Sequence, residues 1–157
     1  MARDNDRVNI KISSRAFSHG FDITTPRETF SVDVSPFGEL LILNVSGTQI
    51  ARVTKESFLG SVYDVIISGG GFYQINHDKG LKERWTCEGE GKTIHFSKEA
   101  GSRFVLEEKA LKIAECKRTW FDNDWAITLV DEAQFKLVAC IFLVLSLSED
   151  RHSGAVD

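Results

Sequence analysis

The sequence has few of the residues that interrupt or cross-link secondary structure. Among 157 residues there are two prolines, one methionine and three cysteines. An odd number of cysteines cannot form a fully paired disulfide framework, and Cys87, Cys116 and Cys140 do not have the spacing of zinc ligands. The opening residues MARDNDRVNIKI contain no apolar signal-peptide region. These absences favour a reducing, cytoplasmic location over a disulfide-rich secreted protein.

Patterns that support catalysis or metal binding are also missing. The glycines at 69–71 are not followed by the strand–loop–helix context of a phosphate loop. Residues 122–124 (DND) carry oxygen ligands but lack the remaining ligands of a calcium loop. No metal-binding or nucleophile–base spacing links the histidines, which are His19, His77, His95 and His152. We therefore expect a protein that is not an enzyme, with no catalytic residue, metal site or cofactor.

The charge balance gives no general reason to expect nucleic acid as a partner. The formal net charge is −4, but residues 79–118 carry a net charge of +3, which leaves −7 for the remainder. The basic segment could orient the protein near an anionic surface, or it could be an ordinary solvated face. The 27% charged and 42% hydrophobic residues are typical of one globular domain.

Short apolar or alternating segments separated by glycine-bearing turns predict about a dozen β-strands, a number and spacing typical of a barrel or a sandwich. Pro26 and Pro36 both fall between these segments, where they interrupt no hydrogen-bond ladder. The clearest expected strands are 8–12, 29–34, 38–45, 48–56, 61–67, 72–77, 81–87, 92–97, 103–108, 111–118 and 124–130.

The chain also resembles itself at an offset of 63 residues. Nine positions match like for like, including Leu43 with Leu106, Ala51 with Ala114 and Val53 with Cys116, and residues 63–67 match 125–129 one deletion later. Generic hairpins also resemble one another, so the match has a simpler explanation as well. We interpret it as two related β-layers that form one closed structure.

Residues 137–145 read LVACIFLVL, nine apolar residues without interruption. A membrane-spanning helix needs about 20 mostly apolar residues, so this stretch is too short. A buried strand is an alternative because Val and Ile lower helix propensity, but Asp131 and Gln134 fit a helix N-cap and capping box. We expect a helix at about 132–147 that is buried on every side inside a β-barrel.

The resulting fold prediction is mainly β, with about twelve strands from two pseudo-repeats closed around a C-terminal hydrophobic helix. One domain covers residues 8–150, and flexible tails cover 1–7 and 151–157.

Three features resemble the tubby-like fold of LURP-one-related proteins, tubby C-terminal domains and phospholipid scramblases. They are the doubled motif GTQIARVTK and ALKIAECKR, the segment FDNDWAITLVDEAQF, and the apolar C-terminal helix that closes with SLSED. The resemblance implies a twelve-stranded barrel threaded by a hydrophobic helix. It also implies membrane association, since tubby domains bind phosphoinositide headgroups. The cysteine-rich palmitoylation cluster and Pro-rich arm of scramblases are absent.

The candidate headgroup site follows from this resemblance and from the basic middle segment. Lys82 and Arg84 share one face of an expected strand with Lys79 at the adjoining turn, and Lys117 and Arg118 form a second basic pair. Nearby glutamates make an ordinary exterior face the alternative. We therefore expect a non-enzymatic module that binds anionic phospholipid or phosphoinositide headgroups at the cytoplasmic membrane surface, without crossing the membrane. The alternative is a soluble protein-interaction or scaffold domain.

Overall fold

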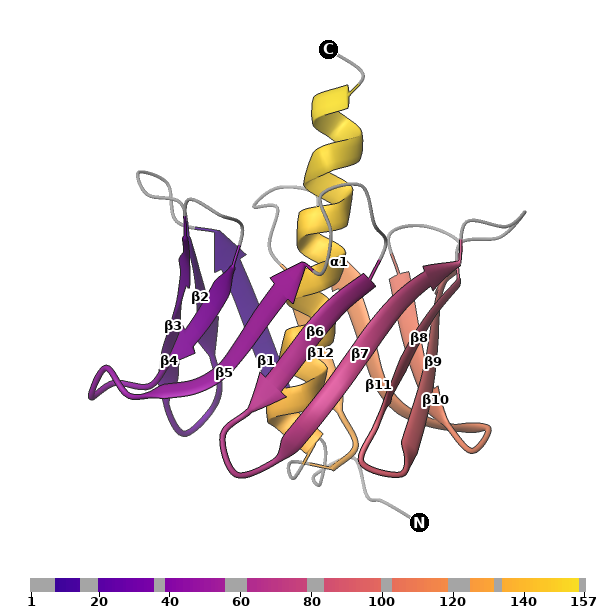
Figure 1. Ribbon diagram of the computed structural model, residues 1–157, viewed down its shortest axis with the longest axis horizontal. Helices are drawn as coiled ribbons and strands as arrows, with labels where there is room; N and C mark the ends of the chain where they lie inside the picture. The colour runs from indigo at the N-terminus through magenta and orange to yellow at the C-terminus, as the bar shows by residue number, and fades with distance from the viewer. Residues whose placement is uncertain are drawn as a thin grey trace.

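The structure is a computed structural model that describes residues 8–14, 20–35, 39–55, 62–78, 84–99, 103–118, 125–131 and 134–155. They form a closed barrel of twelve antiparallel strands around one C-terminal helix (Figure 1). The elements are β1 (Val8–Ser14), β2 (Gly20–Thr24), β3 (Thr29–Val34), β4 (Leu40–Leu43), β5 (Gln49–Lys55), β6 (Val62–Ile67), β7 (Gly71–Asp78), β8 (Arg84–Gly89), β9 (Lys92–Glu99), β10 (Arg103–Glu108), β11 (Leu111–Arg118), β12 (Trp125–Leu129) and α1 (Phe135–Ala155).

The barrel closes because β1 pairs with strands from both ends of the chain. Ile10 is the register partner of Ile127 in β12, while Ile12 is the partner of Ile23 in β2. Every other strand pairs with its neighbours in sequence, so no described strand has an open edge. This closure confirms the barrel prediction and excludes the sandwich.

Alternation along the strands directs one set of side chains into the barrel. In β3, Phe30 and Val32 are buried between more exposed neighbours, and Trp85 and Cys87 do the same in β8. The same alternation of apolar and polar residues, with a period of two, predicted these strands from the sequence. The interior is therefore lined by apolar side chains from all twelve strands.

The helix α1 fills the space inside the barrel. Each side chain from Leu137 to Leu145 is at most 5% exposed, so the apolar stretch is buried on every side as expected. Figure 1 shows α1 running lengthwise through the barrel, with its last turns beyond the strand ends. Among the described residues, no helix has both the length and the hydropathy that a bilayer crossing requires.

The helix begins and ends later than the sequence predicted. It runs from Phe135 to Ala155 instead of 132–147, so it continues into the segment that was expected to be a tail. At its start the Gln134 N–H donates to the Asp131 carbonyl over 3.1 Å, which places a turn before the helix proper. The chain needs this turn to pass from β12 in the wall to the barrel interior. At its far end the apolar residues stop, but no glycine or proline interrupts the helix before Gly154.

The two repeats are present, but their first strands align one residue away from the offset of 63. In β5 and β11 the inward residues Ala51 and Ala114 correspond at that offset. Their register partners are Ile42 and Leu106, which are 64 residues apart. An offset of 63 in β4 and β10 would match inward residues with outward ones, because a one-residue slip reverses the faces of a strand.

Candidate functional site

One end of the barrel, here called the hairpin end, gathers most of the described connections. Because the strands run up and down in sequence order, every second connection falls at the same end. Figure 1 shows these turns at the lower end, where α1 begins. The hairpin end consists of the turns 25–28, 44–48, 68–70, 90–91 and 109–110 with their flanking residues, and of 130–131 and 134–136.

The exposed large hydrophobic side chains of the described residues all lie at the hairpin end. Val45 is 81% exposed in the β4–β5 turn, and Leu111 is 71% exposed just after the β10–β11 turn. Ile66 and Phe72 are 49% and 48% exposed and are register partners beside the β6–β7 turn. Apolar side chains exposed on separate hairpin tips are available for an external contact.

Lysines surround these apolar tips. Lys92, Lys109 and Lys136 are exposed, and none of the three forms an ion pair with another described residue. Lys112 differs because its ammonium donates to the Glu115 carboxylate over 3.0 Å, while the Arg103 Nε approaches the other Glu115 oxygen at 2.8 Å. The hydrogen bond from Lys112, followed by that from Arg103, holds the pKa of Glu115 below its ordinary value.

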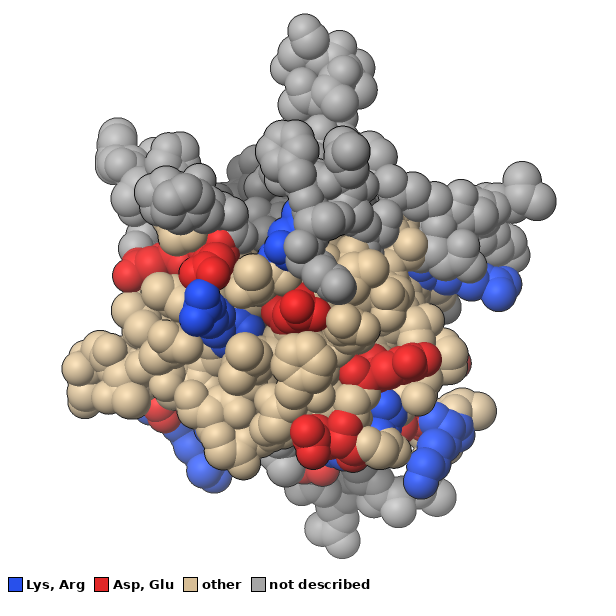
Figure 2. Space-filling view, viewed as in Figure 1, with Lys and Arg blue, Asp and Glu red and all other residues tan. Residues whose placement is uncertain are grey.

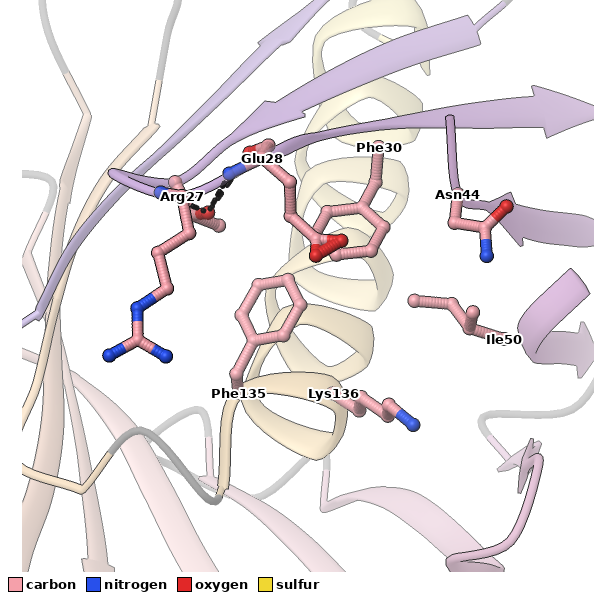
Figure 3. Close-up of a pocket in the computed structure, with 8 residues that line it drawn as sticks. Arg27, Glu28, Phe30, Asn44, Ile50, Phe135 and Lys136 are labelled. Carbon is pink, nitrogen blue, oxygen red and sulfur yellow. Dashed lines mark hydrogen bonds between the residues drawn. The ribbon is translucent and has the colours of Figure 1, made fainter. Parts of the chain in front are cut away.

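A first cavity of about 370 Å³ lies between the β2–β3 turn, the β4–β5 turn and the start of α1. Its apolar wall includes Phe30 and Phe135, whose ring centroids are 5.1 Å apart and tilted by 36°. Figure 3 shows Glu28 extending toward these rings, with Arg27 and Lys136 to either side of Phe135. The full lining is Thr25, Arg27, Glu28, Phe30, Asn44, Ile50, Phe135 and Lys136.

Local hydrogen bonds define the two turns that border the first cavity. The Thr25 hydroxyl accepts from the Glu28 N–H at 3.0 Å and donates to the Glu28 carbonyl at 2.9 Å. The Asn44 side-chain oxygen accepts from the N–H groups of Ser46 and Thr48. Such side-chain bonds to nearby backbone are why Thr and Asn favour turns. They hold the Glu28 and Asn44 backbones in defined positions beside the cavity.

A second cavity of about 470 Å³ lies between the β6–β7 turn and the start of α1. Tyr73, Lys92 and Gln134 are among its lining residues. Burial raises the pKa of Tyr73, and the Glu90 carboxylate adds to that effect, so the phenol is protonated at neutral pH. The Gln134 side-chain oxygen is buried and has no hydrogen-bond partner among the described residues. Both cavities therefore flank the same first turn of α1.

The described residues include only part of the two basic groups expected from the sequence. Lys79 and Lys82 lie outside the described residues, and so does the side chain of Arg118 at the end of β11. Arg84 is exposed at the start of β8, and Lys117 is exposed on β11. Three strand spacings, about 14 Å, separate β8 from β11. Figure 2 shows acidic and basic side chains interspersed over the face formed by β5, β6 and β7.

The described residues offer no reactive thiol. Burial, with a smaller effect of Glu88, raises the pKa of Cys87 to about 12. Burial also raises the pKa values of Cys116 and Cys140. A thiolate is needed for nucleophilic attack or metal ligation, so these groups act as small apolar side chains. Within the described ranges, no group of three or more His, Cys, Asp or Glu residues is placed to hold a metal ion, and the expected DND segment lies outside them.

The residues chosen from the sequence did not include the hairpin end, because the candidate site was built on basic side chains. The available signal was an apolar residue placed where turn chemistry calls for a polar one, as at Val45 and Leu111. Phe72, directly after three glycines, is a third case. The cavities gave no signal, since their lining residues come from segments that lie far apart in the sequence.

Comparison with known proteins supports the fold. A protein from Arabidopsis thaliana, AT5G01750, whose structure was determined by X-ray, superposes with a TM-score of 0.54. The match covers 92% of this chain and 91% of that chain at 16% sequence identity. No family model matches the sequence, and no curated protein matches it. The chain is therefore similar in architecture to this plant protein.

Proposed function

We propose that the barrel is a non-enzymatic module that binds anionic phospholipid headgroups at the cytoplasmic surface of a membrane. The observation that carries this proposal is the grouping of the four large hydrophobic side chains that are exposed among the described residues at the hairpin end, where lysines also lie. The sequence resemblance to LURP-one-related proteins, tubby domains and scramblases is a second reason for the proposal. Phosphoinositides are among the anionic headgroups that it includes.

The arrangement of the apolar tips suits a lipid surface. Val45, Leu111 and the Ile66–Phe72 pair stand on three separate hairpins, and four strand spacings, about 19 Å, separate β7 from β11. A protein partner of ordinary size would favour one continuous apolar patch. A membrane interface can contact several separate tips at once, and its affinity grows with the apolar area that each tip inserts.

The lysines explain a preference for anionic lipid. Lys92, Lys109 and Lys136 have no ion-pair partner among the described residues, so each ammonium can pair with a lipid phosphate. A basic residue near an anionic bilayer contributes about 1 kcal/mol. Three such residues give roughly two orders of magnitude in affinity between anionic and neutral vesicles. The attraction should weaken as salt screens it.

The test is co-sedimentation of the purified protein with vesicles, comparing neutral lipid with anionic lipid at low and physiological salt. In the variant K92Q/K109Q, affinity for anionic vesicles should fall by about 2 kcal/mol, roughly 30-fold. In F72S/L111S, binding should fall on both vesicle types because less apolar surface can insert. Circular dichroism of each variant checks that the barrel remains folded.

The matched control is R84Q/K117Q, which removes two charges from the strand faces predicted by the sequence. If this variant loses affinity while K92Q/K109Q does not, lipid binding belongs to the sequence-predicted residues, and the hairpin end is the wrong site. Absence of binding to every vesicle type would reject the function itself.

The alternative function is a soluble protein-interaction domain. The adjacent Ile66 and Phe72 side chains on β6 and β7 favour it, since a paired exposed apolar patch suits a protein contact. A photo-crosslinking residue at position 72 distinguishes the two functions. Crosslinks to lipid in reconstituted vesicles support the membrane proposal, and a single protein adduct in cells without lipid crosslinks supports the alternative.

A further inference from the structure

We propose that the first cavity binds the ammonium end of a zwitterionic phospholipid headgroup, either phosphocholine or phosphoethanolamine. This inference rests on the proposed membrane function for its lipid source, and it specifies the headgroup chemistry. The observation that carries the inference is a carboxylate and two phenyl rings that line one cavity. They come from two segments far apart in the sequence, the β2–β3 turn with the start of β3, and the start of α1.

Glu28 supplies the negative charge. Its backbone is held by the Thr25 hydroxyl, and its side chain extends toward the Phe30 and Phe135 rings (Figure 3). The carboxylate forms no ion pair with another described residue. Lys136 lines the same cavity but does not pair with this carboxylate, so the carboxylate can accept a cation from a ligand. An ammonium group from the headgroup is such a cation.

The two phenyl rings add a second feature that favours an organic cation. Phe30 is 7% exposed and Phe135 is partly buried, and both residues line the cavity. Aromatic faces attract ammonium groups through the ring quadrupole, and methylated ammonium also gains apolar contact. The combination of a carboxylate with aromatic rings therefore suits choline better than it suits a metal ion or an uncharged sugar.

The phosphate of the headgroup has cationic neighbours at the same cavity. Arg27 and Lys136 both line it, and Figure 3 shows them on either side of Phe135. Basic side chains bind phosphate oxygens through charge-assisted hydrogen bonds. The cavity volume of about 370 Å³ lies near the lower end of the usual range for small-molecule sites, about 300–1,000 Å³, which fits a headgroup. An inositol headgroup offers no ammonium for Glu28.

The experiment titrates ¹⁵N-labelled protein with soluble phosphocholine and phosphoethanolamine and follows backbone amide shifts. Inorganic phosphate and inositol phosphate serve as ligands that lack the ammonium. We expect saturable shifts confined to residues 25–30, 44–48 and 134–136 for the two ammonium ligands. The inositol and inorganic phosphates should shift these amides more weakly.

Two substitutions test the residues that carry the inference. E28Q removes the charge with little change in shape, and it should weaken phosphocholine binding by roughly three- to tenfold. F135L keeps an apolar side chain but removes the ring, and it should weaken choline more than inorganic phosphate. The matched control is E88Q, which removes the same charge from an exposed position on β8 that does not line the cavity.

The outcomes separate this inference from the proposed function. Phosphocholine shifts at the cavity that E28Q weakens and E88Q does not would support the inference, even if vesicles fail to bind and the membrane function is rejected. Vesicle binding that persists while soluble phosphocholine gives no shifts at the cavity would overturn the inference alone. Equal shifts from inositol phosphate and phosphocholine would also overturn it, since they would show recognition of phosphate only.

Discussion

The strands β4–β6 and β10–β12 are the two copies of the repeat, and they share a pattern of inward residues. Ala51 and Val53 in β5 correspond to Ala114 and Cys116 in β11, and all four are buried. Both first hairpins also contain a register irregularity, after Ile42 in one copy and after Leu106 in the other. The copies are therefore alike in the features that shape the barrel wall.

Their outer faces differ in charge. In the first copy the Arg52 guanidinium pairs with the Glu39 carboxylate, and in the second the Arg103 guanidinium pairs with Glu115. Arg52 corresponds to Glu115, and Glu39 corresponds to Arg103, so the acid and the base have exchanged strands. Exposed ion pairs contribute about 0–1 kcal/mol in either orientation. The comparison shows that the pair persists as a cross-strand contact while its polarity is free to change.

The copies also differ in their relation to the helix. Of the twelve strands, β5 and β6 of the first copy approach α1 most closely, while β11 and β12 of the second copy do not. One helix cannot lie equally close to two opposite walls of a barrel unless the side chains on both sides match. The strands of the wall are duplicated but the helix is not, so the single helix makes the two copies of the repeat unequal.

The largest expected effect comes from a substitution in α1, the helix around which both copies of the repeat close. Ile141→Asp places a charge at a side chain that is 0% exposed in the middle of α1. An unpaired buried charge costs several kcal/mol, comparable with the whole free energy of unfolding of a domain, about 5–15 kcal/mol. We expect loss of the cooperative thermal transition. A soluble variant with an unchanged melting temperature would contradict the buried position of α1.

An intermediate effect distinguishes the two copies by their distance from the helix. Ala51→Leu and Ala114→Leu add the same side chain at corresponding inward positions, which are 1% and 0% exposed. Overpacking of a core costs about 1–3 kcal/mol. Ala51→Leu should be the more destabilising because β5 lies closer to α1. Urea unfolding midpoints at constant slope measure the difference, and a larger cost at position 114 would contradict the asymmetry.

The smallest expected effect concerns the turns of the two first hairpins. The β4–β5 turn places Gly47 at φ +82°, whereas the β10–β11 turn places Lys109 and Ala110 at φ +51° and +65°. Ala110→Gly should therefore stabilise the protein by about 0.5–1 kcal/mol, because it relieves a left-handed conformation that costs an L-residue about 1–2 kcal/mol. Gly47→Ala, with no neighbouring atom in its way, should destabilise by a similar amount.

Differential scanning calorimetry of the two turn variants gives the test. Opposite changes in melting temperature agree with the observed backbone angles. A lower melting temperature for Ala110→Gly would mean that the Lys109–Ala110 turn is held by something other than its backbone conformation.

The repeat was visible in the sequence, but its correct alignment was not. Leu41 and Phe104 match in kind at the offset of 63, yet Phe104 is buried at 1% exposure and Leu41 is only half-buried. The register partners show that Leu40 is the true counterpart of Phe104. When adjacent residues of a strand are all apolar, the sequence does not show which of them face the barrel interior. Only the hydrogen-bond register between strands shows which side chains point inward.

The candidate site was less predictable than the fold. The basic residues chosen from the sequence formed two separate groups, one with Arg84 on β8 and one with Lys117 on β11, and Lys79 and Lys82 lie outside the described residues. The first cavity joins Glu28, Asn44 and Phe135, and no local pattern links residues so distant in the chain. Its polar members occupy turns, where the sequence gives the same residues an ordinary structural role.

Local periodicity determined most of the architecture without any tertiary information. Alternation with a period of two sets the strands, and an uninterrupted apolar run that is too short for a bilayer requires an enclosed helix. Tertiary structure alone decided the start of α1, its closeness to β5 and β6, and the meeting of the hairpin turns at one end. These features depend on how side chains from distant segments pack, and packing is a property of the closed barrel that no single segment contains.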